Sequence, residues 1–237
     1  ALYFNTTGSQ NAAMSSQALN TNTTGSNNTA TGYRSLNANT IGSHNTATGW
    51  RALNSNIDGS YNVAIGSQSL YTSQNVSNLT AIGYQALYSN TTGTQNTAIG
   101  SQALYTNRTG SNNTANGTNA LYQKITGTNN TAIGRSAGST YDISGNQNTY
   151  LGATTDCSNN GLVLNNSTAV GYGAIIDASN QIVLGTSSER VKIPGSYVGI
   201  GGVYNPSSGF SLDVSGNGRF IQDCNINSLT VGRGGGN

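Results

Sequence analysis

The chain has 237 residues, of which only 9 are Lys or Arg and 7 are Asp or Glu, and its net charge is +2. Its charged fraction of 7%, against about 25% in average soluble domains, excludes the basic surface that nucleic-acid binding requires. No apolar run is long enough to span a membrane and no secretory leader opens the chain, so we expect neither. Asn, Thr, Ser and Gly, with 35, 30, 29 and 32 residues, make up more than half of the sequence.

A strict 17-residue period organises residues 1–134, with the consensus N-T-A-I-G-S-Q-A-L-Y-T-N-T-T-G-S-Q. A disordered low-complexity tract has no reason to keep such a spacing, so the period indicates a repeat fold. Gly also recurs at this spacing in two series. One begins at Gly32, and the other, which begins at Gly8, is broken only by Val76. The two strictest series are Leu at 2, 19, 36, 53, 70, 87, 104 and 121, and Ala at 13, 30, 47, 64, 81, 98, 115 and 132.

The repeat unit is too short for two helices and a turn, and its Gly, Asn and Thr content disfavours helix. Each unit instead has a short β-compatible stretch, such as 97–99, followed by Gly and by N-T-T-G turn chemistry. The sequence therefore predicts an all-β fold, a parallel β-solenoid (β-roll) with one repeat per coil. A fixed Gly in every coil indicates a corner that needs positive φ or close backbone approach, so Val76 predicts a local distortion.

The invariant Leu and Ala are the predicted inward positions of each coil. We add to them a third place that varies between Met, Thr, Ile and Asn, at Met14, Thr31, Thr48, Ile65, Ile82, Ile99, Asn116 and Ile133. A core this thin stabilises little against the conformational entropy of a whole repeat unit. Association of several chains is therefore expected.

The period loosens after Gly134, where strand-plus-Gly signatures at 150–152, 169–171 and 183–185 follow at gaps of 18, 19 and 14. From Pro194 onward the sequence is no longer repetitive. We therefore divide the chain into a regular array at 1–134, an irregular end of the roll at 135–195, and a connector at 196–237 that leads to a further segment.

The N-T-A-I-G-x-x-A-L units, with N-S-T-A-V-G at 166–171 and N-Q-I-V-L-G at 180–185, resemble the head repeats of YadA-type trimeric autotransporter adhesins. That resemblance implies a left-handed roll in an intertwined homotrimer. The stretches at 191–195, 198–201 and 212–220 resemble the stalks of phage and large-virus tail fibres, which often precede an intramolecular chaperone. The 17-residue period is longer than the autotransporter unit.

Aromatic residues recur in one register, where Tyr71, Tyr88, Tyr105 and Tyr122 follow Asn20, Asn37 and Asn54. Such a ladder is either a structural stack or a strip for stacking on carbohydrate. Tyr33-Arg34 and Trp50-Arg51 add two aromatic and cationic pairs on adjacent coils. They are suited to glycan or carboxylate capture, and equally to packing at a subunit edge.

No cofactor, metal site or catalytic residue is expected. His44, the only histidine, falls at a variable turn place, and Cys157 and Cys224 are too far apart for a zinc or redox motif. The carboxylate pair of a glycosidase would share a repeat register in such an array, but no two acidic residues here do.

We therefore expect a structural fibre protein, extracellular on a virion or cell surface, that attaches to a host glycan or receptor. A viral or phage tail fibre is favoured, and a bacterial surface adhesin is the alternative. Two minor alternatives are a glycan depolymerase and an ice-binding solenoid, the latter because Thr-x-Thr occurs at 29–31 and 46–48.

Overall fold

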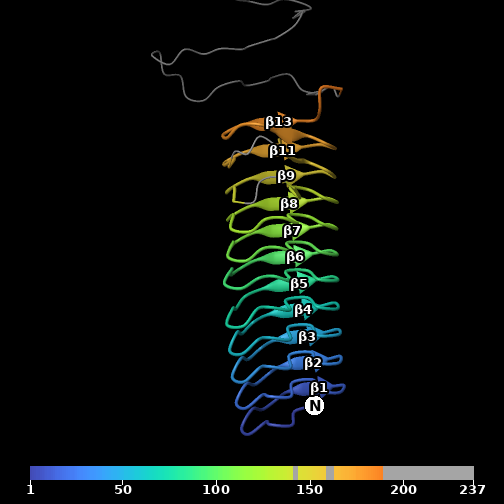
Figure 1. The fold of residues 1–237 in the computed structure, drawn as a ribbon, viewed down its shortest axis with the longest axis vertical. Helices are drawn as coiled ribbons and strands as arrows, with labels where there is room; N and C mark the ends of the chain where they lie inside the picture. Colours follow the sequence, from blue (N-terminus) through green and yellow to red (C-terminus); the bar gives the residue numbers. More distant parts are fainter. Residues whose placement is uncertain (141–143, 159–162, 189–237) are drawn as a thin grey trace, which may run out of the picture. The chain divides into compact units, whose positions relative to one another are not determined.

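The structure, a computed structural model, describes residues 1–140, 144–158 and 163–188. In these residues the chain winds into a stack of coils, and nearly every coil adds one short strand to a common sheet (Figure 1). The sheet has eleven parallel strands in the order β1-β2-β3-β4-β5-β6-β7-β8-β9-β11-β13, and β10 and β12 form a separate parallel pair. The prediction of an all-β parallel solenoid is confirmed.

The strands are short and evenly spaced. Those of the large sheet are β1 (Ala12–Met14), β2 (Thr29–Thr31), β3 (Thr46–Thr48), β4 (Val63–Ile65), β5 (Thr80–Ile82), β6 (Thr97–Ile99), β7 (Thr114–Asn116), β8 (Thr131–Ile133), β9 (Thr149–Leu151), β11 (Thr168–Val170) and β13 (Ile182–Leu184). The pair consists of β10 (Asp156–Cys157) and β12 (Ile175–Ile176).

Strand pairing follows the sequence period. Ala13 pairs with Ala30, and each later Ala of the regular array pairs with the equivalent Ala of the next repeat. The same register continues through Ala132, Tyr150, Ala169 and Val183, across the coils of unequal length that follow the regular array. The sheet therefore fixes the strands, and the differences in coil length are taken up outside them.

The corners of each coil need unusual backbone. The Gly that directly follows each strand of the large sheet from β2 onward has positive φ, for example 130° at Gly100, as the sequence predicts for a corner. The other Gly series has ordinary φ but close packing, since a Cβ on Gly25 would overlap the carbonyl oxygen of Gly42. Both reasons for a fixed Gly therefore operate, each in its own column.

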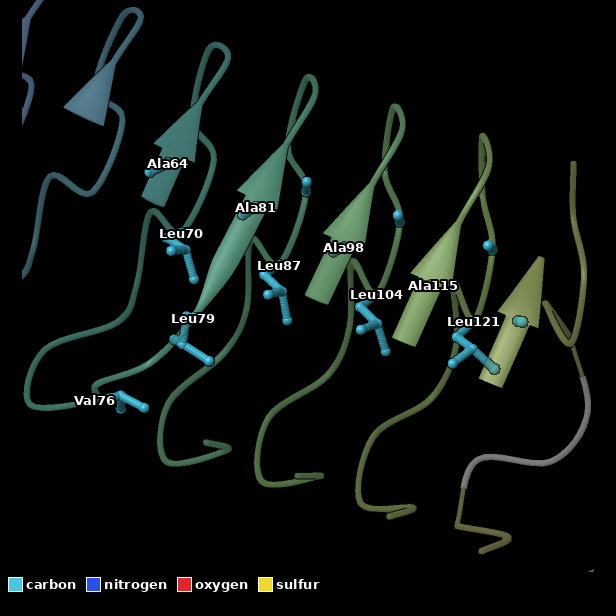
Figure 2. Packing of buried hydrophobic residues seen from close by; sticks show 14 of the residues in the cluster. Ala64, Leu70, Val76, Leu79, Ala81, Leu87, Ala98, Leu104, Ala115 and Leu121 are labelled. Carbon is cyan, nitrogen blue, oxygen red and sulfur yellow. The ribbon is translucent and has the colours of Figure 1, made fainter. Parts of the chain in front are cut away.

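The invariant Leu residues lie inward, as predicted, but in an unexpected conformation; they are fully buried from Leu19 onward, and Leu2 of the first coil is partly buried. Leu87 has φ of 51°, and the other members of its column have φ between 49° and 52°. This left-handed region costs an L-residue roughly 1–2 kcal/mol. Leu holds it because the corner turns its side chain onto the buried Ala of neighbouring coils (Figure 2).

The third predicted core position is wrong, because it lies on the outer face of the sheet. Ile65, Ile99 and Ile133 are 39%, 38% and 43% exposed, and Met14 is 68% exposed. Successive side chains of a strand point to opposite faces, so an inward Ala places both its neighbours outward. The result is an outer face with one row mainly of Thr and one row mainly of apolar residues, which we call the Ile row after its commonest residue.

Buried asparagines, which the sequence analysis did not place in the core, fill the rest of the interior. In one ladder Asn39 Nδ2 donates to Asn22 Oδ1 (2.7 Å) and to the carbonyl of Gly42 (2.9 Å). In the other, Asn28 Nδ2 donates to the same carbonyl (2.8 Å), and Asn28 Oδ1 accepts the N–H of Asn45 (2.9 Å). These amides satisfy turn groups that would otherwise be buried without partners.

The predicted distortion at Val76 is confirmed. Residues 73, 76 and 79 are Ser, Val and Leu where neighbouring coils have Asn, Gly and Asn, and Val76 and Leu79 join the buried cluster (Figure 2). Strand pairing through β5 is unchanged. The distortion is therefore confined to the turn.

The chain after residue 188 is outside the described residues, so the predicted connector at 196–237 is too, as is the end of the 135–195 section. In the part that the structure describes, no helix is long and apolar enough to cross a membrane.

Candidate functional site

The predicted aromatic residues lie in one corner of the coil, just after the strand. The strand-ending Gly is followed by the place of Tyr33 and Trp50, then by the place of Arg34 and Arg51, which has positive φ. Two residues later the buried Leu turns the chain again, and the next residue is the Tyr of the ladder. The close spacing of these turns brings the two predicted groups to the same edge of the solenoid.

The four ladder tyrosines form a continuous stack. Ring centroids of Tyr71 and Tyr88, of Tyr88 and Tyr105, and of Tyr105 and Tyr122 are each 5.2 Å apart, with interplanar angles of 8°, 15° and 5°. The rings are half-buried, with the remaining surface exposed. Burial, and then the neighbouring rings of Tyr122, Tyr88 and Tyr84, raise the pKa of Tyr105. The Tyr105 hydroxyl is therefore uncharged at neutral pH.

Each arginine of the predicted pairs lies over the aromatic ring that precedes it. The guanidinium carbon of Arg51 is 4.7 Å from the centroid of the Trp50 ring, and that of Arg34 is 5.3 Å from the Tyr33 ring. Arg34 Nε also donates to Gln17 Oε1 (2.5 Å), whereas the buried Arg51 Nε has no hydrogen-bond partner among the described residues. Both aromatic rings keep exposed surface, 38% for Tyr33 and 44% for Trp50.

The two groups belong to adjacent columns. Asn54, which occupies the ladder register, donates through Nδ2 to the carbonyl of Arg34 (3.0 Å). Further along, Tyr122 lines a shallow cavity of about 290 Å³ together with Gln102 and Asn119, which occupy the arginine column. We call the resulting surface the aromatic strip; it consists of Tyr33, Arg34, Trp50, Arg51, Tyr71, Tyr84, Tyr88, Tyr105 and Tyr122.

The strip spans six coils, which at about 4.8 Å per coil is about 24 Å. Tyr84, 50% exposed, was not among the predicted contacts, although it shares the register of Tyr33 and Trp50. Gln side chains in the arginine column bond from coil to coil, as Gln85 Nε2 does to Gln68 Oε1 (3.0 Å). The strip therefore offers aromatic faces, amides and two guanidinium groups, which suit sugar rings and acidic substituents.

The other predicted residues form no reactive group. His44 is exposed and stacks on Tyr61, with centroids 4.9 Å apart. Cys157 is buried, and Cys224 lies outside the described residues. In the described residues no three His, Cys, Asp or Glu side chains gather as metal ligands would. Burial raises the pKa of Asp156, whose carboxylate accepts hydrogen bonds from Thr140 and from the Cys157 N–H.

Comparison with models of protein families and with curated proteins gives no match to this chain.

Proposed function

We propose that the chain is a structural fibre segment that attaches to a host or surface glycan through the aromatic strip, without catalysis. The observation that carries the proposal is the stack of four partly exposed tyrosine rings, with the Tyr33-Arg34 and Trp50-Arg51 pairs on the coils before it. A stiff scaffold that repeats every coil holds these rings in a line, which lowers the entropic cost of binding an extended chain of sugars. The resemblance of residues 191–220 to tail-fibre stalks favours a viral fibre over a bacterial adhesin, whose head repeats the array resembles.

The proposed fibre is a homotrimer, in which the outer sheet face packs between copies. The interior of a single coil is made of Leu, Ala and Asn, and the Ile row lies outside it. Burying that row stabilises an assembly by about 25 cal/mol for each Å² of apolar surface removed from water. The row carries no charged residue from Met14 to Leu184, so packing it desolvates no ionised group.

We expect the native mass in solution to be about three times the 24.3 kDa of the chain. Analytical ultracentrifugation measures it. Ile99→Lys, on the outer face, is expected to reduce the mass to that of the single chain while the β-sheet circular dichroism remains, because it places a charge in the interface rather than in the coil. A folded wild-type monomer would contradict the trimer.

We expect Trp50→Ala to weaken binding to an acidic polysaccharide by about 1–3 kcal/mol, a typical loss for an aromatic contact. Affinity electrophoresis through gels that contain polygalacturonate, with amylose gels for neutral sugar, measures the change. Arg51→Gln should weaken only the binding to polygalacturonate, because it removes charge but keeps an amide in the column.

The matched control is Tyr61→Ala, which removes an exposed ring from the other corner of the coil. It should leave binding unchanged. Melting temperature and native mass should stay close to wild type in all three variants. A large loss of melting temperature in Trp50→Ala with binding preserved would reject the strip and favour a subunit contact at this corner.

Ice binding is the second candidate, and it uses the outer face. Both Thr of 29–31 and of 46–48 flank the buried Ala and so face outward, and Thr continues in the first row through most later strands. Ile replaces Thr in the second row from Ile65 onward, which breaks the Thr-x-Thr pattern. Thermal hysteresis at micromolar protein would support this alternative.

A further inference from the structure

One coil of the array differs from its neighbours at three linked positions. Ser73 and Leu79 each replace one Asn of an interior ladder, and Val76 replaces the closely packed Gly between them. One consequence is that Asn56 Oδ1, which the next ladder Asn would satisfy, is buried without a partner among the described residues. The changes stand together within one turn of an otherwise regular array.

The regular turn closes by donating backbone N–H groups to the next coil. The N–H groups of Thr23, Thr24 and Gly25 converge on the carbonyl of Thr40, at 2.8, 3.1 and 3.3 Å. From the turn at Thr6 to the turn at Arg108, every other turn of this column places one to three N–H groups on the following carbonyl. Successive N–H groups that face one oxygen form a nest, which binds oxygen atoms of other groups as well.

The turn of 74–76 is the exception. None of the N–H groups of Gln74, Asn75 and Val76 has a hydrogen-bond partner among the described residues. The cause is steric, because at this column a Cβ overlaps the backbone of the next coil, as it would at Gly93 against Gly110. The Val76 side chain therefore keeps the carbonyl of Thr91 away from the donors that it would meet in a regular array.

A cavity of about 370 Å³ lies between the two separated turns. Thr72, Gln74, Asn75 and Val76 line one side, and Thr91, Thr92 and Thr94 line the other. Its volume is in the range of small-ligand sites. It brings together these backbone donors, the carbonyl of Thr91, which accepts no hydrogen bond from the described residues, and the methyl groups of Val and Thr.

Charge around the cavity favours a neutral ligand. No Lys or Arg lines it. Asp58 occupies the register of Asn75 one coil earlier, and the Asn75 amide nitrogen, in the orientation that satisfies both its side-chain atoms, donates to Asp58 Oδ1 (3.0 Å). A carboxylate or phosphate in the cavity would be repelled by that aspartate, and Arg108, the cation one coil beyond Thr91, does not line the cavity.

We propose that this cavity binds the acetamido group of an N-acetylated sugar. The missing partner of the turn is a peptide carbonyl, and the acetamido group is the sugar substituent with the same chemistry: its C=O accepts the N–H groups of 74–76, its N–H donates to the Thr91 carbonyl, and its methyl group packs on Val76. The site is separate from the aromatic strip, and its ligand class does not depend on the strip binding glycan.

Saturation-transfer NMR on the 237-residue chain tests the proposal, with N-acetylglucosamine, glucose and acetate as separate probes. We expect transfer from the protein to the acetyl methyl protons of N-acetylglucosamine, and none to glucose or acetate. The closing variant is Ser73→Asn/Val76→Gly/Leu79→Asn, which copies the neighbouring coils and should fold at least as well as wild type. It should reduce the acetyl signal to the level of glucose, and Val76→Gly alone should reduce it too.

Two matched variants separate this site from other effects. Thr24→Val alters the same column in a closed turn, and Trp50→Ala alters the strip; both should keep the acetyl signal. Absence of the signal in wild type, or its survival in the closing variant, would overturn the proposal. Acetate binding as strongly as N-acetylglucosamine and lost in the closing variant would overturn the assignment to acetamido, and loss of the signal in Trp50→Ala would move it to the strip.

Discussion

Leu87→Asp is expected to abolish the folded state of the central coils. The side chain is fully buried among Ala and Leu of its own and adjacent coils. Truncating a buried Leu costs about 2–5 kcal/mol, and an unpaired carboxylate in its place adds several kcal/mol more. Aspartate tolerates the left-handed φ of 51° at this corner better than Leu does, so the loss comes from burial of charge and not from the backbone.

Limited proteolysis and thermal melting followed by circular dichroism measure the effect. Leu87→Met keeps the volume and should cost less than about 1.5 kcal/mol. Ile99→Asp places the same charge on the outer face, in the adjacent coil, and should leave the coil folded. If Leu87→Asp resisted protease as well as Ile99→Asp does, the inward assignment of the Leu column would be wrong.

The parallel solenoid could be predicted because every coil repeats the same constraints. A strict period without insertions fixes one strand per coil. The strands pair at that same 17-residue spacing, as Ala13 does with Ala30. The period does not say which residues point inward. Ile99 is apolar and Asn39 is polar, so hydrophobicity alone assigns them the wrong way round. Their true places follow from strand alternation and from turn groups that require a buried amide.

The left-handed Leu could not be predicted from local preference, because Leu rarely adopts that conformation in isolation. Its place is set by burial in the assembled stack, which outweighs the local cost. The prediction that the invariant Leu occupies a core position is confirmed. The corner that it makes is a tertiary property.

The aromatic residues were predicted column by column, and stacking within the Tyr ladder follows directly from the shared register. Adjacency of that ladder to the arginine column could not be predicted, since it depends on the tight turn between Gly and Leu. Tyr84 was missed as a contact for the same reason, and the structure places it near Tyr105. The repeat period therefore predicts which residues share a column, whereas the geometry of the turn determines which columns lie side by side.

Val76 shows the difference between predicting a defect and predicting its effect. The broken Gly series located the distortion. That the N–H groups of 74–76 lack partners among the described residues is seen only by comparison with the hydrogen bonds of the regular turns. The array tolerates a Cβ in this column because the turn can open outward while the strand stays paired.

The corner after the strand has no such freedom, and Gly100→Ala is expected to be strongly destabilising there. The backbone has φ of 130°, and a Cβ would lie 2.5 Å from the carbonyl oxygen of Gly117. The unfavourable φ costs about 1–3 kcal/mol, and relief of the overlap costs about 1–3 kcal/mol more. Strand β6 is paired on both sides, so the coil cannot move away without breaking its ladder.

Chemical denaturation measures the loss of unfolding free energy in Gly100→Ala, and two other positions serve for comparison. Ser15 occupies the same column with φ of 125°, but it follows β1, which is paired on one side only and can shift. Gly173 has positive φ and open space, since a Cβ there would meet nothing closer than 3.6 Å. Gly173→Ala should therefore lose only the backbone contribution, about 1 kcal/mol. Equal losses for the two Gly→Ala variants would show that close approach between coils does not limit this corner, and that φ alone explains why every central coil has Gly here.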